Sequence, residues 1–249
     1  LKKCASKSEK KLKNTGRNNM SLSNELSAEV DDILRTSWST RDGEIVPDAE
    51  DVQLGNDAVK LNGTVLYADL AESTNLVKGF QDWFAAMIYK SYLTCASRII
   101  KNNGGTITAF DGDRVMAVYI GKQKSTSAVK TALQINYAVQ NIINPKIQEN
   151  YPKTNYTMRQ TVGIDTSALF IARTGIRGSN DLVWVGRSAN YAAKLCSIRD
   201  SNYSSYITAA VYEMMNASVK SGGDPQRSMW QEFTWTEFKE KIYRSNWLW

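Results

Sequence analysis

The sequence predicts an α+β domain of the ferredoxin-like kind, with an antiparallel-rich sheet and helices on one face. Between residues 63 and 220, segments with strand-like alternation are interleaved with two longer segments of helical periodicity. Two of the strand-like segments, 106–110 and 114–120, are separated by the turn residues Asp111 and Gly112 and therefore predict a hairpin. The order strand, helix, hairpin, helix, strands is typical of this fold class.

The first half of this domain is predicted from its caps and turns. Residues 63–70 alternate into an apolar strand. Ser73 or Thr74 then caps a helix that runs to about Ile100. A glycine pair at 104–105 ends that helix before the hairpin begins.

The second half is predicted from periodicity and from a proline. A helix covers about 127–143 and stops before Pro145, because the residue before a proline is disfavoured in helical conformation. The remaining elements are two paired strands, a short strand, a helix and a last strand, at 156–164, 168–174, 182–185, 188–196 and 206–209.

The termini are expected to differ from the domain, which is assigned to residues 63–220. Residues 21–62 predict a short amphipathic helix followed by a polar arm, and 221–249 a C-terminal extension. The first seventeen residues hold seven lysines and arginines and one glutamate, so they carry the whole net charge (7 − 1 = +6). We expect residues 1–20 to be a disordered basic tail and, because the chain starts at Leu1, a non-native extension.

Composition excludes several kinds of chemistry. The chain has no histidine, which rules out Ser-His-Asp and Cys-His nucleophiles and histidine-bound zinc. No apolar run approaches the ~20 residues that span a bilayer, and the lysine-rich start is unlike a signal peptide. Cys4, Cys95 and Cys196 are scattered and suggest no disulfide framework, so we expect a cytoplasmic protein without a membrane partner. A basic tail can contact nucleic acid, but a solvated tail without a nucleic-acid partner is preferred.

Two aspartates carry the strongest chemical signal. Asp69, in VLYADLAEST, ends an apolar strand, and Asp113, in AFDGDRVMAVY, follows an Asp-Gly turn and starts the next strand. Two carboxylates placed in this way can share two divalent ions, Mn²⁺ or Mg²⁺, an arrangement that favours phosphoryl chemistry. Each aspartate alone also fits a helix cap or a turn, and the pair is what favours metal binding.

A third segment, WVGRSANYAAKL, places Asn190 and Lys194 one helical turn apart on one face. Periodicity alone describes them as surface residues of an ordinary helix. Together, however, the three segments resemble the motifs of class III nucleotidyl cyclases. VLYADLAEST resembles the first metal motif, FDGDRVMAV the second metal hairpin, and VGRSANYAAKL the late Gly-x-x-x-Asn-x-x-x-Arg segment. They occur in the family's order and cover residues 63–197.

This resemblance implies a role for each matching residue. Asp69 and Asp113 match the aspartates that hold two ions per site, and the carbonyl of Leu70 matches a further ligand. Asn190 matches the residue that orients the ribose, and Lys194 stands where the family has an arginine that stabilises the transition state. The residues that match the phosphate-binding loop at a helix start are Ala71, Glu72, Ser73 and Thr74. The family also implies a head-to-tail homodimer with shared active sites.

The base pocket departs from that of the purine cyclases. Ala109 and Val183 stand where the resemblance places residues that read adenine or guanine, and neither can hydrogen-bond a purine edge. Tyr67 shares a strand face with Asp69; it is either a plain core aromatic or a side chain that narrows the pocket. The chain thus resembles the pyrimidine cyclases of bacterial Pycsar antiphage systems. The implied activity is a uridylate cyclase that uses UTP and makes an antiviral second messenger for a separate effector protein.

Three alternatives remain open from the sequence. The first is a cytidylate cyclase that makes cyclic CMP. The second is a cyclase-like module that binds nucleotide without turnover, for which the lysine at position 194 is the main support. The third is another two-metal enzyme on a similar sheet, but the glycine pair at 104–105 is followed by Thr-Ile-Thr and not by the Asp-Glu-Phe of diguanylate cyclases.

Overall fold

The computed structural model describes residues 21–249, so the expected basic tail at 1–20 lies outside the described residues. The described residues divide into two units, the first ending at Ser37 and the second spanning Trp38–Trp249. In the described part of the first unit, α1 (Leu22–Arg35) is the expected amphipathic helix. The Ser21 side chain caps it by accepting a hydrogen bond from the backbone N–H of Asn24, and no side chain of α1 is buried.

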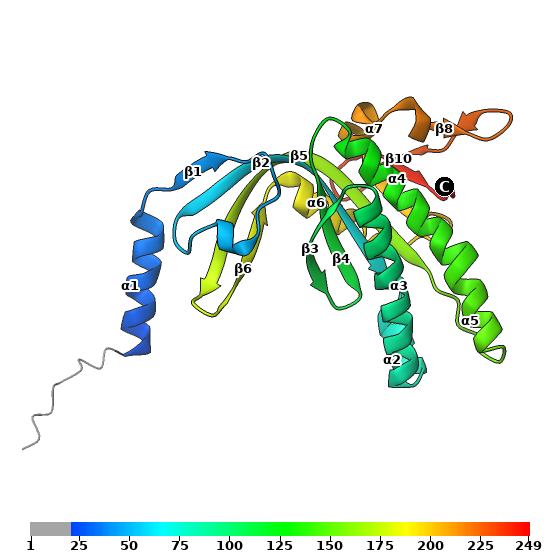
Figure 1. Cartoon of the computed structure of the whole chain (residues 1–249), viewed down its shortest axis with the longest axis horizontal. Coiled ribbons are helices and arrows are strands. Elements are labelled where there is room, and N and C mark those ends of the chain that lie inside the picture. Colours follow the sequence, from blue (N-terminus) through cyan, green and yellow to red (C-terminus); the bar gives the residue numbers. More distant parts are fainter. Residues whose placement is uncertain (1–20) are drawn as a thin grey trace, which may run out of the picture. The chain divides into compact units, whose positions relative to one another are not determined.

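The second unit is built on a nine-stranded sheet within residues 38–249 (Figure 1). Seven strands follow the order β10-β11-β7-β5-β2-β4-β3, while β1 pairs with β2 and β6 with β5. The pairs β1–β2 and β5–β7 are parallel and the other pairs are antiparallel, which confirms the antiparallel-rich sheet. The strands are β1 (Ser39–Asp42), β2 (Asp57–Leu70), β3 (Thr106–Asp111), β4 (Arg114–Tyr119), β5 (Gln160–Ile176), β6 (Ser179–Val185), β7 (Ser205–Thr208), β10 (Gln231–Trp235) and β11 (Glu240–Ser245). A separate two-stranded ribbon joins β8 (Ser221–Gly222) to β9 (Arg227–Ser228).

The helices α3 and α4 cover one face of this sheet, and the main core lies between them and the strands (Figure 1). Alternation along β2 separates the two faces: Leu66, Ala68 and Leu70 belong to the main core, while Val65 and Tyr67 belong to a second cluster under α6 on the opposite face. The helices are η1 (Ala49–Asp51), α2 (Ser73–Gly79), α3 (Asp82–Asn102), α4 (Lys124–Tyr137), η2 (Ala138–Ile143), α5 (Asn144–Asn150), α6 (Arg187–Leu195), α7 (Ala209–Met214) and η3 (Ala217–Val219).

The strand β5 is continuous where two shorter strands were predicted. It pairs with β2 without interruption from Gln160 to Ala172. The predicted break falls at Asp165 and Thr166, which are buried polar residues that read as turn formers in the sequence. Both are hydrogen-bonded by distant side chains, Asp165 by Arg187 and Thr166 by Thr64, so the strand continues through them.

The helices differ from the prediction at two places. The helix predicted from 73 to 100 is divided into α2 and α3, because Phe80 is extended, with φ −132° and ψ 166°. The helix predicted to stop before Pro145 continues through the π-helical η2 into α5. Pro145 stands in the first turn of α5, where the missing N–H of a proline is tolerated.

The residues after 220 add strands to the same sheet, since β11 pairs with both β7 and β10. An ion pair between Arg244 and Asp200, at 3.1 Å, ties β11 to the segment that follows α6. The Arg244 guanidinium also lies over the rings of Tyr203 and Phe233, 4.0 and 4.2 Å from their centroids. The C-terminal strands therefore hold the segment 199–204 in place.

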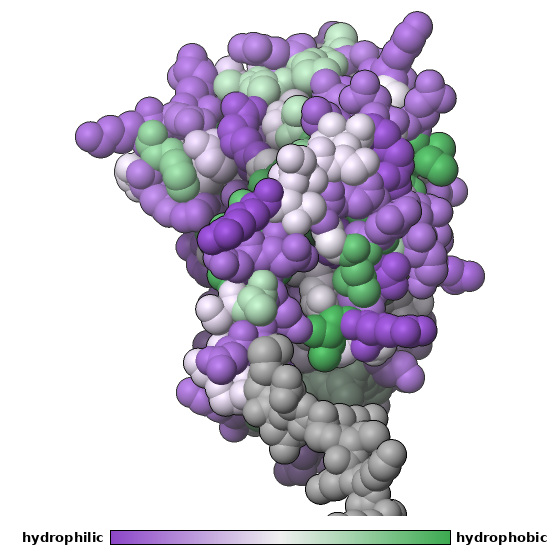
Figure 2. Space-filling model, turned by 90° about the vertical axis from the view of Figure 1, so that its left-hand side faces the viewer, coloured by the Kyte–Doolittle hydropathy of each residue, from purple (hydrophilic) through white to green (hydrophobic). Residues whose placement is uncertain are grey.

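The surface is mixed in character. Figure 2 shows one face, on which hydrophobic residues form small patches separated by hydrophilic ones. Across residues 21–249, every helix is too short or too polar to cross a membrane.

Candidate active site

Asp69 lies at the end of β2, on the face opposite the main core. Its side chain is 13% exposed, and Arg199 Nη2 donates a hydrogen bond to its Oδ2 at 2.6 Å. Burial raises the pKa of the Asp69 carboxyl, the hydrogen bond and charge of Arg199 lower it, and the charge of Asp113 raises it. The carboxylate is therefore a largely desolvated anion that needs a cationic partner.

Asp113 lies in the turn between β3 and β4, directly before β4, which begins at Arg114 as predicted. Gly112, with φ +60°, makes this tight turn possible. The register pairs Asp69 with Arg114, so the neighbouring Asp113 is brought to the same end of β2. Its Oδ2 is buried and has no hydrogen-bond partner, which is costly for a carboxylate unless a cation binds there.

These two aspartates fit a divalent cation. One offers an unpartnered buried oxygen and the other a shielded anionic carboxylate, and oxygen donors of this kind suit Mg²⁺ or Mn²⁺. In the part of the chain that is described, no group of three or more Cys, Asp or Glu side chains is arranged to hold a metal. Further ligands must then come from the backbone, where the Leu70 carbonyl is the expected donor, or from substrate.

The loop after Asp69 turns sharply into α2. Glu72 is left-handed, with φ 61° and ψ 29°, and its carbonyl accepts hydrogen bonds from the N–H groups of residues 75 and 76. Arg159 holds this loop twice: its carbonyl accepts from the Ala71 N–H at 2.9 Å, and its guanidinium pairs with the Glu72 carboxylate. The predicted phosphate-binding residues Ser73 and Thr74 form the first turn of α2.

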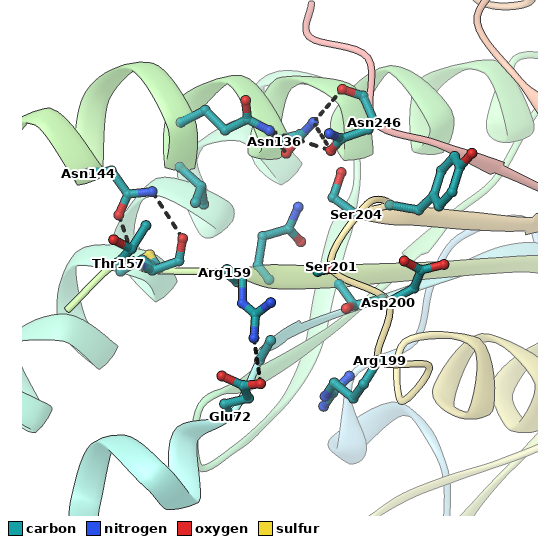
Figure 3. Close-up of a pocket in the computed structure, with 17 residues that line it drawn as sticks. Glu72, Asn136, Asn144, Thr157, Arg159, Arg199, Asp200, Ser201, Ser204 and Asn246 are labelled. Carbon is teal, nitrogen blue, oxygen red and sulfur yellow. Dashed lines mark hydrogen bonds and ion pairs between the residues drawn. The ribbon is translucent and has the colours of Figure 1, made fainter. Parts of the chain in front are cut away.

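A cavity of about 450 Å³ adjoins this loop (Figure 3). Figure 3 shows Glu72 and Arg159 pointing toward each other on one side, with Arg199 and Asp200 on the segment after α6. Neither Arg159 nor Arg199 belongs to a motif that predicts a role from the sequence. Their partners lie 87 and 130 residues away, and no local motif marks either arginine.

The helix α6 carries Asn190 and Lys194 across the second face of the sheet. It packs closely at Gly163, where an added Cβ would come within 2.2 Å of the Ala192 carbonyl oxygen. Asn190 is exposed. Lys194 pairs with Glu237 and lies 4.8 Å from the ring centroid of Phe238, so both partners are in the connection between β10 and β11. Within a single chain, the structure pairs Lys194 with these residues and not with the aspartates.

The predicted base-pocket residues are only partly brought together. Tyr67 and Ala109 pack against the second cluster, and the Arg114 guanidinium lies 5.5 Å from the Tyr67 ring centroid. Burial raises the pKa of the Tyr67 phenol. The neighbours of Val183 on β6, Leu182 and Trp184, contact that cluster. Because side chains alternate along a strand, Val183 faces the other way, 39% exposed.

The fold is that of the class III nucleotidyl cyclase catalytic domain. The adenylyl cyclase CyaB from P. aeruginosa matches with a TM-score of 0.62 at 19% identity, over 76% of this chain and 95% of that one. A class III adenylyl cyclase-like ATP-binding protein from Pseudomonas aeruginosa matches with a TM-score of 0.60 at 16% identity, over 79% and 43% of the two chains. No protein-family model matches the chain.

Sequence relatives define the family more narrowly. A uridylate cyclase from Xanthomonas perforans is 49% identical over 232 residues, which cover 92% of this chain and 99% of the relative. A uridylate cyclase from Burkholderia cepacia is 44% identical over 232 residues, with 92% and 99% covered. The chain belongs to the uridylate cyclase family.

Proposed function

We propose that this chain converts UTP to 3′,5′-cyclic UMP and pyrophosphate. The observation that carries the proposal is its 49% identity to a uridylate cyclase over 92% of the chain. In the reaction, the ribose 3′-oxygen forms a bond to the α-phosphorus while the bond from that phosphorus to the departing pyrophosphate oxygen breaks. The hydroxyl proton passes to solvent, so no protein base is required.

In this proposal Asp69, Asp113 and the Leu70 carbonyl hold two Mg²⁺ or Mn²⁺ ions. Bound ions lower the pKa of the 3′-hydroxyl and neutralise the triphosphate. The buried, unpartnered oxygen of Asp113 supports this role. The loop formed by Ala71, Glu72, Ser73 and Thr74 binds phosphate oxygens at the start of α2.

Asn190 and Lys194 act on the ribose and on the developing charge. Asn190 orients the sugar so that the 3′-oxygen is aligned with the α-phosphorus. The Lys194 ammonium offsets negative charge that grows on the α-phosphate oxygens. Both are proposed to serve the aspartates of the partner subunit in a head-to-tail homodimer. The exposure of Asn190 and the pairing of Lys194 with Glu237 in its own chain support a site shared between subunits.

Selectivity for a pyrimidine is attributed to Tyr67 and Ala109, which lie in one cluster near the aspartates. A purine edge facing apolar side chains would leave its polar groups unpaired, which costs ~1–3 kcal/mol per group. Val183 is proposed to disfavour purines because it lacks a hydrogen-bonding group, although within a single chain it faces away from Tyr67. A cytidylate cyclase that makes cyclic CMP remains the nearest alternative, because no residue that reads base position 4 is identified.

The biological role is proposed from the resemblance to Pycsar cyclases. Cyclic UMP would serve as an antiviral second messenger in the cytoplasm, read by a separate effector, with no nucleic-acid or membrane partner. A nucleotide-binding module without turnover is a second candidate, favoured by the lysine at position 194 and by the ATP-binding protein that shares this fold.

The test is to incubate the purified chain with each of the four nucleoside triphosphates and Mn²⁺ and to resolve the products by chromatography. We expect cyclic UMP as the main product, and a loss of at least ~100-fold in turnover for Asp69→Ala and Asp113→Ala with unchanged circular dichroism. A faster reaction with ATP or GTP would contradict the substrate assignment. Full activity in either folded variant would contradict the two-metal site.

A further inference from the structure

We infer that Arg199 is a built-in counter-cation of the metal site: its guanidinium balances Asp69, and a divalent ion that binds Asp69 displaces it. The inference rests on the metal site of the proposed function and deepens it. It assigns a role to a residue outside the three motifs of the sequence.

The contact itself is short, and its carboxylate is shielded from water while the Arg199 side chain is 40% exposed. Arg199 Nη2 lies 2.6 Å from Asp69 Oδ2, and the Asp69 side chain is only 13% exposed. Hydrogen bonds between ionised groups are stronger than neutral ones, and shielding from water strengthens them further. Without this contact, Asp69 would be a desolvated carboxylate beside Asp113. The like charge of Asp113 raises the pKa of Asp69.

Arg199 is held in position from both sides. Its Nη1 donates to the Cys196 carbonyl at 2.6 Å, at the C-terminal end of α6, where the helix dipole favours a positive charge. The next residue, Asp200, pairs with Arg244 at 3.1 Å, and Arg244 is fixed in turn by the two aromatic rings beside it. The guanidinium is thus anchored toward Asp69 and differs from a freely moving surface arginine.

A divalent ion on Asp69 conflicts with this pair. The oxygen that accepts from Arg199 is one of the two that the carboxylate can offer to a metal, and two cations at one carboxylate repel each other. The displaced guanidinium can be solvated, because the Arg199 side chain is 40% exposed and lines the cavity of about 450 Å³ (Figure 3). The carboxylates of Glu72 and Asp200 on that cavity keep their own arginine partners. The exchange therefore leaves no buried charge unpaired.

The experiment measures Mn²⁺ affinity of the full chain without nucleotide, from the electron paramagnetic resonance signal of free Mn²⁺. Arg199→Gln should bind Mn²⁺ about tenfold more tightly than wild type, the factor that corresponds to one lost charge-assisted hydrogen bond. Arg177→Gln is the matched control, since it removes the same charge from an exposed arginine, and it should bind as wild type does. Asp69→Ala should lose the binding in either background.

A second measurement compares the thermal unfolding of the variants in the presence of EDTA. Arg199→Gln should melt below wild type in EDTA, and saturating Mn²⁺ should narrow the difference. If this variant does not fold, Arg199→Lys keeps the charge without the planar fork and should give a smaller increase in affinity. Unchanged or weaker Mn²⁺ binding in the folded Arg199 variant overturns the inference, as does Mn²⁺ binding that is independent of Asp69 in both proteins. Turnover of UTP, measured separately, tests the proposed function, so the two can fail independently.

Discussion

At the scale of single residues, Glu72 is in a backbone conformation that side chains disfavour. Its φ of 61° costs an L-residue ~1–2 kcal/mol relative to glycine, and its ion pair with Arg159 is half exposed and returns less than ~1 kcal/mol. We expect Glu72→Gly to be more stable than Glu72→Ala by about 1 kcal/mol, because both lose the ion pair and only glycine relieves the strain.

Urea unfolding of the two variants, followed by circular dichroism, measures this difference. Lys239, the other non-glycine residue with positive φ among residues 21–249, provides a second comparison of glycine with alanine outside the proposed site. If the Gly and Ala variants at position 72 are equally stable, the left-handed conformation carries no strain.

The site residues that could be predicted from the sequence and those that were missed differ in how far along the chain their partners lie. Asp69 and Asp113 stand in local motifs that a short window of sequence contains. Arg199 and Arg159 acquire their roles only through partners that the fold brings from more than 80 residues away. The direction of Val183 was missed for a similar reason, since the face that it occupies depends on the pairing of β6 with β5.

At the scale of elements, α6 is fixed to the sheet by an ion pair between a half-exposed arginine and a buried carboxylate. Asp165 on β5 is fully buried, accepts two hydrogen bonds from Arg187 at 3.0 and 3.2 Å, and accepts a third from Thr208 at 2.5 Å. We expect Arg187→Ala to cost ~3–5 kcal/mol, because it leaves the carboxylate buried without its cation. The half-exposed Arg187 can be solvated alone, so Asp165→Asn should cost less.

A double-mutant cycle with chemical denaturation tests this asymmetry. The double variant Asp165→Asn/Arg187→Ala should recover part of the stability that Arg187→Ala loses, since the buried charge is gone. Equal losses for the two single variants, with no recovery in the double, would show that the stability of the folded chain does not depend on Arg187 as the partner of Asp165.

An element could be predicted from the sequence where the signals that define it are local. The hairpin and α6 were predicted because turn residues and helical periodicity are local. The continuity of β5 was not, because Asp165 and Thr166 resemble a turn until Arg187 and Thr64 satisfy them. The helix through η2 was missed because Pro145 is a reliable stop signal only where the preceding turn is regular, and here that turn is π-helical.

At the scale of the whole molecule, two charged groups of the proposed site, Asp69 and Lys194, are paired inside one chain. Arg199 holds Asp69, and Glu237 holds Lys194. In the proposed mechanism, turnover requires both pairs to change, the first when metal binds and the second when Lys194 meets the α-phosphate. In the proposed dimer, a partner subunit that brings its own metals and triphosphate to Lys194 would supply the competing charge. The final prediction follows from this exchange.

Mixing two inactive variants should restore activity if each site is shared. In a heterodimer of Asp69→Ala and Lys194→Ala, one site lacks both groups and the other has both. Random exchange at equal concentrations should then recover about a quarter of wild-type turnover, since half of the dimers are mixed and each has one intact site of two. Mixing Asp69→Ala with Asp113→Ala is the matched control: both defects lie in the metal-holding subunit, so every site stays damaged and no recovery is expected. Recovery in the control would show that the two aspartates of one site come from different subunits, against the proposed arrangement. No recovery in the first mixture, after subunit exchange has been demonstrated, would place the aspartates and Lys194 of one chain in a single site.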